Sequence, residues 1–167
     1  HPMEALEYNK KFIEQITSAK VSQTQGTLGT PFIWGATNSW GGVRTRNFQY
    51  NQCEYSDDIE PERIDEICEE TMGPHHMTGC FGCQVHCRAQ YKIPSGPWAG
   101  KYDEGPEYTS LGAFGAETDT PRAETVLTGN HLVDQYGMDN PETGSLISWA
   151  MELYELGIIP DKETDGP

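Results

Sequence analysis

Three cysteines with the spacing C-x2-C-x3-C, namely Cys80, Cys83 and Cys87, are the residues best suited to chemistry in this sequence. This spacing can direct three sulfur atoms into one small volume, and Gly79 and Gly82 let the backbone pass close to whatever the sulfurs hold. A disulfide uses only two sulfurs, and Cys80 and Cys83 are too close in sequence for a structural crosslink. The pattern therefore predicts a bound metal ion or an iron–sulfur cluster.

Three interpretations of this cysteine cluster compete. In the first, the thiolates bind three irons of a [4Fe–4S] cluster, and a fourth sulfur comes from elsewhere. In the second, the same sulfurs bind zinc together with His75, His76 or His86, although no second C-x2-C supplies the ligand pair that structural zinc sites usually have. In the third, they are redox thiols, but no hydrophobic strand precedes Cys80. The spacing favours the cluster over zinc, and zinc over redox thiols.

Composition limits the possible partners of the chain. The 167 residues carry a net charge of -15, which argues against a nucleic-acid groove and against adhesion to anionic lipid. No apolar run approaches the ~20 residues of a membrane span. An odd number of cysteines, five, favours metal thiolates in a reducing, cytoplasmic compartment over a disulfide framework. Because the chain begins at His1, we expect residues 1–167 to be a single domain excised from a longer protein.

The elements that must position the cysteines are mainly helical. Periodic apolar residues and capping signals predict helices, and these cover 3–18, 61–72, 107–116, 120–137 and 140–157. A short strand is expected over 90–93, followed by a loop over 94–105. Residues 22–45 lose helical periodicity among glycines, so we expect an ordered loop that packs its aromatic side chains. The sequence therefore predicts a mainly α, loop-rich fold.

The two other cysteines have no cysteine neighbour in the sequence. Cys68 shares one helical face with Ile64 and Ile67, so we expect it to be a core residue rather than a ligand. Cys53 follows a polar turn. Whether either thiol could serve as a fourth ligand is left open by the sequence.

Four runs of residues, in chain order, extend the pattern beyond the cysteines. They are Gly79-Cys80-Phe81-Gly82-Cys83-Gln84-Val85-His86-Cys87, Gly105-Pro106-Glu107-Tyr108-Thr109, Asp134-Gln135-Tyr136-Gly137-Met138-Asp139 and Met151-Glu152-Leu153-Tyr154-Glu155-Leu156-Gly157. Together they resemble the aldehyde ferredoxin oxidoreductase family. Upstream, Arg44-Thr45-Arg46-Asn47-Phe48 is similar to the short motif that leads into the family's cluster segment.

The resemblance implies that this chain is the central helical domain of a longer enzyme that binds tungsten, or molybdenum, through a bis-pterin cofactor. It implies that Cys80, Cys83 and Cys87 bind a [4Fe–4S] cluster next to the pterin, with the fourth cysteine in a D-x-x-G-L-C element outside this chain. The longer enzyme would oxidise an aldehyde to a carboxylic acid and pass the electrons through the cluster to ferredoxin. The isolated chain would be inactive.

The resemblance also implies roles for single residues. Asp134, Gly137, Met138 and Asp139 match the first pterin-binding element, with Met138 in place of the usual leucine. Glu107 matches the active-site glutamate of a P-E-Y-E-T pattern, although Thr109 and Ser110 depart from its last two residues.

Simpler interpretations stand beside these roles. Without the resemblance, Asp139-Asn140-Pro141 is a helix start, and Glu107 is a solvated glutamate favoured by a helix dipole. The histidines are given no catalytic role, and His131 is expected on a helix face. The competing hypothesis for the whole chain is a non-catalytic zinc-binding or iron–sulfur electron-transfer module.

Overall fold

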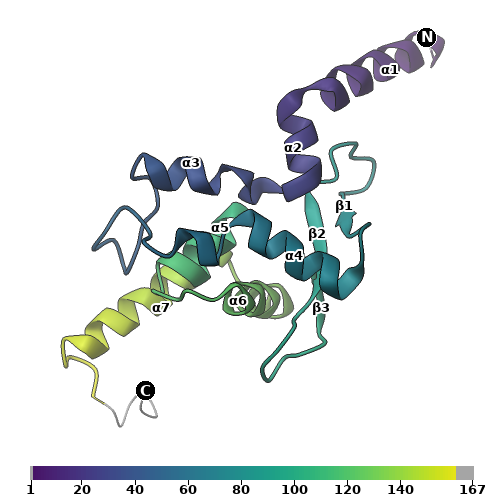
Figure 1. Ribbon diagram of the computed structural model, residues 1–167. Coiled ribbons are helices and arrows are strands. Elements are labelled where there is room, and N and C mark those ends of the chain that lie inside the picture. The colour runs from purple at the N-terminus through teal and green to yellow at the C-terminus, as the bar shows by residue number, and fades with distance from the viewer. Residues whose placement is uncertain (1, 161–167) are drawn as a thin grey trace.

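The computed structural model describes residues 2–160, and helices form most of this part of the chain (Figure 1). The helices are α1 (Pro2–Ser18), α2 (Lys20–Leu28), α3 (Trp34–Ser39), α4 (Pro61–Met72), α5 (Tyr108–Leu111), α6 (Ala123–Tyr136) and α7 (Asn140–Glu155). Shorter turns are the 3-10 segments η1 (Thr30–Ile33) and η2 (Ser56–Asp58) and the π-helical segment η3 (Gly112–Ala116). The prediction of a mainly α fold is confirmed, whereas the ends of the predicted single domain, residue 1 and residues 161–167, lie outside the described residues.

The strands form one small antiparallel sheet in the order β1-β2-β3. Its strands are β1 (Met77–Thr78), β2 (Arg88–Lys92) and β3 (Tyr102–Glu104). Helices α4 and α6 pack against β2 through Ile67, Tyr91 and Leu127, which are at most 1% exposed. A second apolar cluster surrounds the fully buried Trp34 and Leu111. These two clusters hold the sheet, α5 and α6 in fixed relation, and the candidate site is built on these elements.

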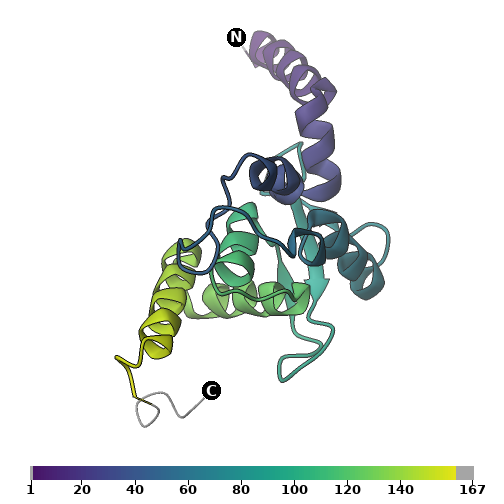
Figure 2. The same cartoon turned by 60° about the vertical axis from the view of Figure 1, so that its left-hand side comes forward.

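Helix α1 confirms the helix predicted over 3–18, but its apolar side of Leu6, Phe12 and Ile16 does not enter the core. None of its described residues is buried, and Phe12 is 55% exposed. Figures 1 and 2 show the helix projecting away from the body of the molecule. The amphipathic pattern therefore predicted a helix correctly without predicting what the helix packs against.

The expected loop over 22–45 is wrong over most of its length, because α2, η1 and α3 extend to Ser39. Glycines in this segment suggested breaks in a helix, yet two of them serve close packing. A Cβ on Gly26 would lie 2.9 Å from the carbonyl oxygen of Val85, and one on Gly29 would lie 2.9 Å from that of Cys87. The expected packing of aromatic residues is confirmed at Trp34, which is 0% exposed, and is wrong at Trp40, which is 78% exposed.

Several boundaries also differ from expectation. The loop predicted over 94–105 contains β3, because Tyr102–Glu104 pairs with β2. Helix α6 begins at Ala123 with Arg122 as its N-cap, because Arg122 is extended and the Thr120 hydroxyl bonds to the Thr118 carbonyl rather than to the helix. In the part of the chain that the structure describes, no helix combines the length and the apolar character needed to cross a membrane.

Candidate functional site

The three cysteines of the motif lie in one loop, residues 79–87, between β1 and β2. A backbone hydrogen bond of 2.9 Å from the Cys83 N–H to the Cys80 carbonyl forms a tight turn at the start of this loop. Gly82 has φ +74, in the left-handed region that favours glycine. Cys80 is exposed, whereas Cys83 and Cys87 are half-buried, and all three are free thiols.

The backbone influences the Cys83 thiol directly. The Val85 N–H donates to the Cys83 sulfur at 3.5 Å. Hydrogen bonds from the backbone of Val85 and His86 lower the pKa of Cys83 below its ordinary value. A lowered pKa favours the thiolate, which is the form that binds metals. Across residues 2–160, however, no three His, Cys, Asp or Glu side chains converge as a metal site, so a bound cluster would have to draw the three sulfurs together.

The cysteine loop packs against the end of α2. The contacts of Gly26 and Gly29 described above leave no room for a side chain between this helix and the carbonyls of Val85 and Cys87. Gly29 has φ +68 and ψ -169, a conformation open essentially to glycine alone. The next residue, Thr30, therefore lies at the base of the cysteine loop.

Thr30 joins Glu107 to this region although the two residues are 77 positions apart in the sequence. The Thr30 hydroxyl donates to Glu107 Oε2, and the Tyr108 N–H donates to the Thr30 hydroxyl at 2.9 Å. Glu107 is half-buried and occupies the N-cap position of α5, but its own side chain does not cap the helix. It is therefore a positioned carboxylate rather than a solvated residue of a helix's first turn.

Cys87 and Glu107 are close enough to interact electrostatically. Burial raises the pKa of Cys87, and the negative charge of Glu107 raises it further, followed by smaller contributions from Cys83 and Cys80. The structure thus brings the predicted catalytic glutamate to the edge of the loop that carries the predicted metal ligands.

The Asp134–Asp139 turn connects α6 to α7. Gly137 is left-handed, with φ +63, and its N–H bonds to the last carbonyls of α6. Asp139 is the N-cap of α7 and accepts a hydrogen bond from the Glu142 N–H at 2.9 Å, so the cap is Asp139 and not Asn140 as the sequence suggested. Gly137, Met138 and Asp139 are exposed, and Met138 is 50% exposed. The turn is well ordered by its own hydrogen bonds and open to a ligand.

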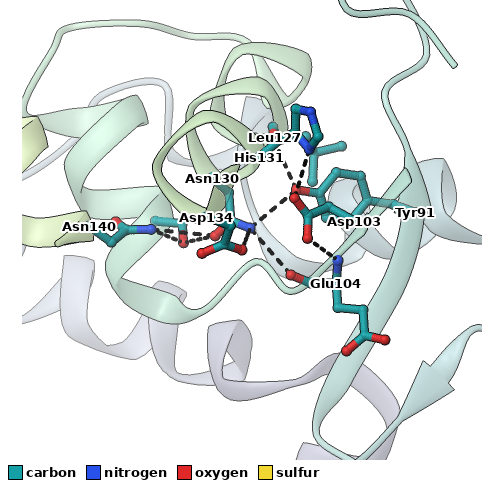
Figure 3. A network of polar contacts seen from close by, with 9 residues as sticks. Tyr91, Asp103, Glu104, Leu127, Asn130, His131, Asp134 and Asn140 are labelled. Atoms are coloured by element: carbon teal, nitrogen blue, oxygen red, sulfur yellow. Dashed lines mark hydrogen bonds and ion pairs between the residues drawn. The ribbon is translucent and has the colours of Figure 1, made fainter. Parts of the chain in front are cut away.

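A polar network with a buried centre connects this turn to the segment that carries Glu107 (Figure 3). At its centre is Asn130, whose side chain contacts Ser110 of α5, Asp134 of α6 and Asn140 of α7. Burial, followed by the negative charge of Asp103, raises the pKa of Asp134 above its ordinary value. The network therefore links Asp134, one of the predicted cofactor-binding residues, to Ser110, which lies three residues after the predicted catalytic Glu107.

The remaining thiols are not available as ligands in this fold. Cys53 is 2% exposed and Cys68 is 0% exposed. Burial raises the pKa of Cys53 to about 11 and that of Cys68 to about 12, which keeps both protonated near neutral pH. The prediction that Cys68 is a core residue is confirmed.

Two histidines have structural partners that the sequence did not reveal. His76 uses both ring nitrogens, one against the Gly73 carbonyl at 3.0 Å and one against Asp65 at 2.8 Å, and so is not free to bind zinc. The expectation of a helix-face His131 is incomplete, because this residue is only 4% exposed and contacts Asp103 at 2.7 Å. The two aspartates lie 11 and 28 positions from their histidines, so the sequence gives no sign of these pairs.

A family model described as aldehyde ferredoxin oxidoreductase, domains 2 and 3, matches residues 7–167. A tungsten-containing aldehyde ferredoxin oxidoreductase of Pyrococcus abyssi is 33% identical over 141 residues, which cover 83% of this chain and 21% of that protein. The enzyme of the same name from Pyrococcus furiosus is 37% identical over 138 residues, covering 81% of this chain and 21% of that protein.

A third relative carries a different name. The aliphatic sulfonate oxidoreductase, WOR-like subunit, of Pyrococcus furiosus is 29% identical over 83 residues, covering 50% of this chain and 13% of that protein. The chain spans about a fifth of the length of the two aldehyde ferredoxin oxidoreductases.

Proposed function

Because this chain belongs to the aldehyde ferredoxin oxidoreductase family, we propose that it is the central domain of a tungsten-pterin enzyme that oxidises an aldehyde to a carboxylic acid. The electrons leave through a [4Fe–4S] cluster to ferredoxin, in the cytoplasm. The match to tungsten-containing relatives over more than four-fifths of the chain supports this proposal. So do the contacts that join the cysteine loop to Glu107 through Gly29 and Thr30, and those that join the Glu107 segment to Asp134 through Asn130.

The residues present suit the two cofactors. The loop of Cys80, Cys83 and Cys87 offers three free thiols, and the N–H···S contact to Cys83 is of the kind that supports a thiolate bound to iron. In the proposed enzyme a fourth cysteine lies outside this chain. Asp134 and Asp139 offer carboxylates to the N–H groups of a pterin, while Gly137 and Met138 shape the turn between them. The same residues would suit a pterin cofactor that carries molybdenum in place of tungsten.

The proposed reaction defines what Glu107 does. Oxidation of an aldehyde to a carboxylic acid adds one oxygen atom from water and releases two protons and two electrons. When bound, the tungsten centre supplies the two-electron acceptor. Glu107 accepts a proton as water adds to the aldehyde carbon, and the Thr30 hydroxyl fixes the orientation of its carboxylate.

The observation that carries the proposal is the position of Glu107. A glutamate that follows a proline is ordinarily solvated at a helix start, as Glu62 is after Pro61. Glu107 instead is half-buried, accepts a hydrogen bond from Thr30 and interacts with Cys87. A carboxylate held beside metal ligands in this way is suited to proton transfer near a redox centre.

The test uses the full-length enzyme, produced without oxygen in medium that contains tungstate. Aldehydes are supplied with ferredoxin in water enriched in oxygen-18, and reduction of ferredoxin is followed together with the mass of the acid formed. We expect aldehyde-dependent reduction of ferredoxin and at least one labelled oxygen in the acid. A protein that contains zinc in place of iron and forms no acid would contradict the proposal and favour the binding module.

A matched pair of variants tests the assigned role of Glu107. Glu107→Gln keeps the size of the side chain but cannot accept the proton, so kcat should fall by about 100-fold or more, with tungsten and iron content unchanged. Glu62→Gln makes the same change at an exposed glutamate that also follows a proline, and it should leave kcat unaltered. Equal activity of the two variants would remove Glu107 from the mechanism.

A further inference from the structure

Asn130 lies at the centre of a polar network that joins four elements of the fold (Figure 3). Its side chain is almost fully buried, with 4% of the residue exposed. The amide oxygen accepts from the Ser110 hydroxyl at 2.7 Å and faces Asn140 Nδ2 at 3.4 Å. Three acceptors surround the amide nitrogen: Tyr91 Oη at 3.2 Å, the Glu104 carbonyl at 3.3 Å and Asp134 Oδ2 at 3.3 Å.

The neighbouring hydrogen bonds fix which way this amide points. The Tyr91 hydroxyl donates to the Leu127 carbonyl at 3.0 Å, so its oxygen can only accept from Asn130. On the other side, Asn140 Nδ2 donates to the Ser110 oxygen at 2.9 Å, and Ser110 in turn donates to Asn130. The donors therefore run in one direction, from α7 through α5 and α6 to the sheet. A rotated amide would place donor against donor and acceptor against acceptor.

Asn130 also contacts the chain on both sides of Glu107, through the backbone before it and the Ser110 hydroxyl after it. A Cβ on Gly105 would lie 3.2 Å from Asn130 Nδ2, and Gly105 has φ +119, a conformation that residues with a side chain rarely adopt. Gly105 comes two residues before Glu107, and Ser110 comes three residues after it. The same side chain that contacts Asp134 thus holds both ends of the segment that carries Glu107.

We propose that Asn130 is a positioning residue that keeps the Glu107 segment and the Asp134 turn in one fixed relation. This inference rests on the proposed function, in which Glu107 moves a proton and Asp134 binds the pterin. Asn130 touches neither substrate nor cofactor. Its effect is geometric, and small displacements of positioned groups produce large losses in rate.

The substitution Asn130→Asp tests the hydrogen bonds that the side-chain N–H groups of Asn130 donate. The variant keeps the acceptor for Ser110, but as a carboxylate it has no proton to offer Tyr91 or Asp134. Protonation restores one donor, so the defect should shrink as the pH falls. Burial and nearby carboxylates disfavour the charged form, which raises the pKa of the new carboxyl group. The titratable and charged groups that surround it are Arg88 and Tyr91 of β2, Asp103 and Glu104 of β3, and His131 and Asp134 of α6.

The experiment measures kcat of the loaded full-length enzyme against pH, as the ratio of variant to wild type. Taking the ratio removes the pH dependence of kcat that comes from Glu107, because both proteins contain this residue. We expect Asn130→Asp to be about tenfold slower than wild type or worse near pH 8, with the ratio rising steadily toward acid pH. Asn130→Ala, which lacks both donor and acceptor, should be slow at every pH.

Val126→Ala is the matched control for loss of stability. Val126 is fully buried on the same helix and makes no hydrogen bond through its side chain. We expect this variant to lower Tm while its kcat ratio stays independent of pH. If Asn130→Asp also gave a flat ratio, or a loss explained by its Tm alone, Asn130 would be an ordinary core residue and the inference would be overturned.

A second readout separates this inference from the proposed function. Pterin retained by each protein after incubation across the same pH range is measured by fluorescence after release and oxidation. A wild-type enzyme that retains pterin but oxidises no aldehyde would refute the proposed function alone. In that case, pterin loss from Asn130→Asp that disappears at acid pH would still support the inference. In that same case, equal retention by Asn130→Asp and wild type at every pH would refute the inference.

Discussion

Replacing Gly26 by alanine tests whether α2 packs against the cysteine loop as the structure shows. In a helix interior, alanine is favoured over glycine by about 1 kcal/mol. At Gly26 the new Cβ would lie 2.9 Å from the Val85 carbonyl oxygen, closer than Cβ atoms are normally found. That oxygen belongs to the backbone and cannot rotate away, so the loop must move. Overpacking of this kind costs about 1–3 kcal/mol.

Gly35 supplies the matched control, because it also lies in a helix, α3, and has no heavy atom within 4 Å of its Cβ position. Gly35→Ala should therefore stabilise the protein by about 0.5–1 kcal/mol. Gly26→Ala should be neutral or should lower the free energy of unfolding by up to about 2 kcal/mol. The close contact with the Val85 carbonyl costs at least as much as the preference of the helix for alanine contributes. The two variants are thus expected to differ by about 1–3 kcal/mol in free energy of unfolding.

Urea unfolding of the 167-residue chain, followed by tryptophan fluorescence, measures this difference. Trp34 is 0% exposed and should report loss of the core. Comparing midpoints at a common m-value avoids the error of long extrapolation. If both substitutions stabilised the chain equally, the cysteine loop would not lie on α2, and the position assigned to Thr30 and Glu107 beside that loop would be unsupported.

Three further predictions follow from the site. Asp139→Ala should lose the cap of α7 and about 1 kcal/mol of stability in urea, whereas Asp139→Asn keeps the cap. Asp134 has a raised pKa, so its ionisation costs stability as the pH rises through that pKa. Asp134→Asn should therefore raise Tm near neutral pH, with the gain vanishing in acid, while it weakens pterin binding. In the metal-free chain, iodoacetamide should modify Cys83, whose pKa is lowered, before Cys87 or Cys53, as read by peptide mass spectrometry.

The sequence predicts best those features that depend on neighbours along the chain. Helix α4 was predicted with its observed bounds, because Pro61 suits the first helical position and its apolar face repeats with the helical period. Gly137 ends α6 in a left-handed conformation as expected. The cysteine motif is visible for the same reason, since all three thiols belong to one short loop.

The features that were missed depend on contacts between distant segments. Helix α2 was taken for a loop because Gly26 and Gly29 resemble helix breakers, whereas their role is to admit the carbonyls of another segment. Thr30 belongs to no recognisable sequence motif, and its hydrogen bond to Glu107 joins two residues that are 77 positions apart. In the sequence, Asn130 is an ordinary polar residue of an amphipathic helix. Its role depends on contacts with α5, α7 and the sheet, which only the structure shows.

Metal analysis of the full-length protein tests the central claim most directly. Iron, acid-labile sulfide, tungsten and zinc are counted per chain after anaerobic purification, for wild type, Cys83→Ser and the buried control Cys68→Ala. The account predicts about four irons and four sulfides in wild type and in Cys68→Ala, and loss of the cluster in Cys83→Ser. Stoichiometric zinc in wild type, or iron and sulfide unchanged in Cys83→Ser, would contradict it.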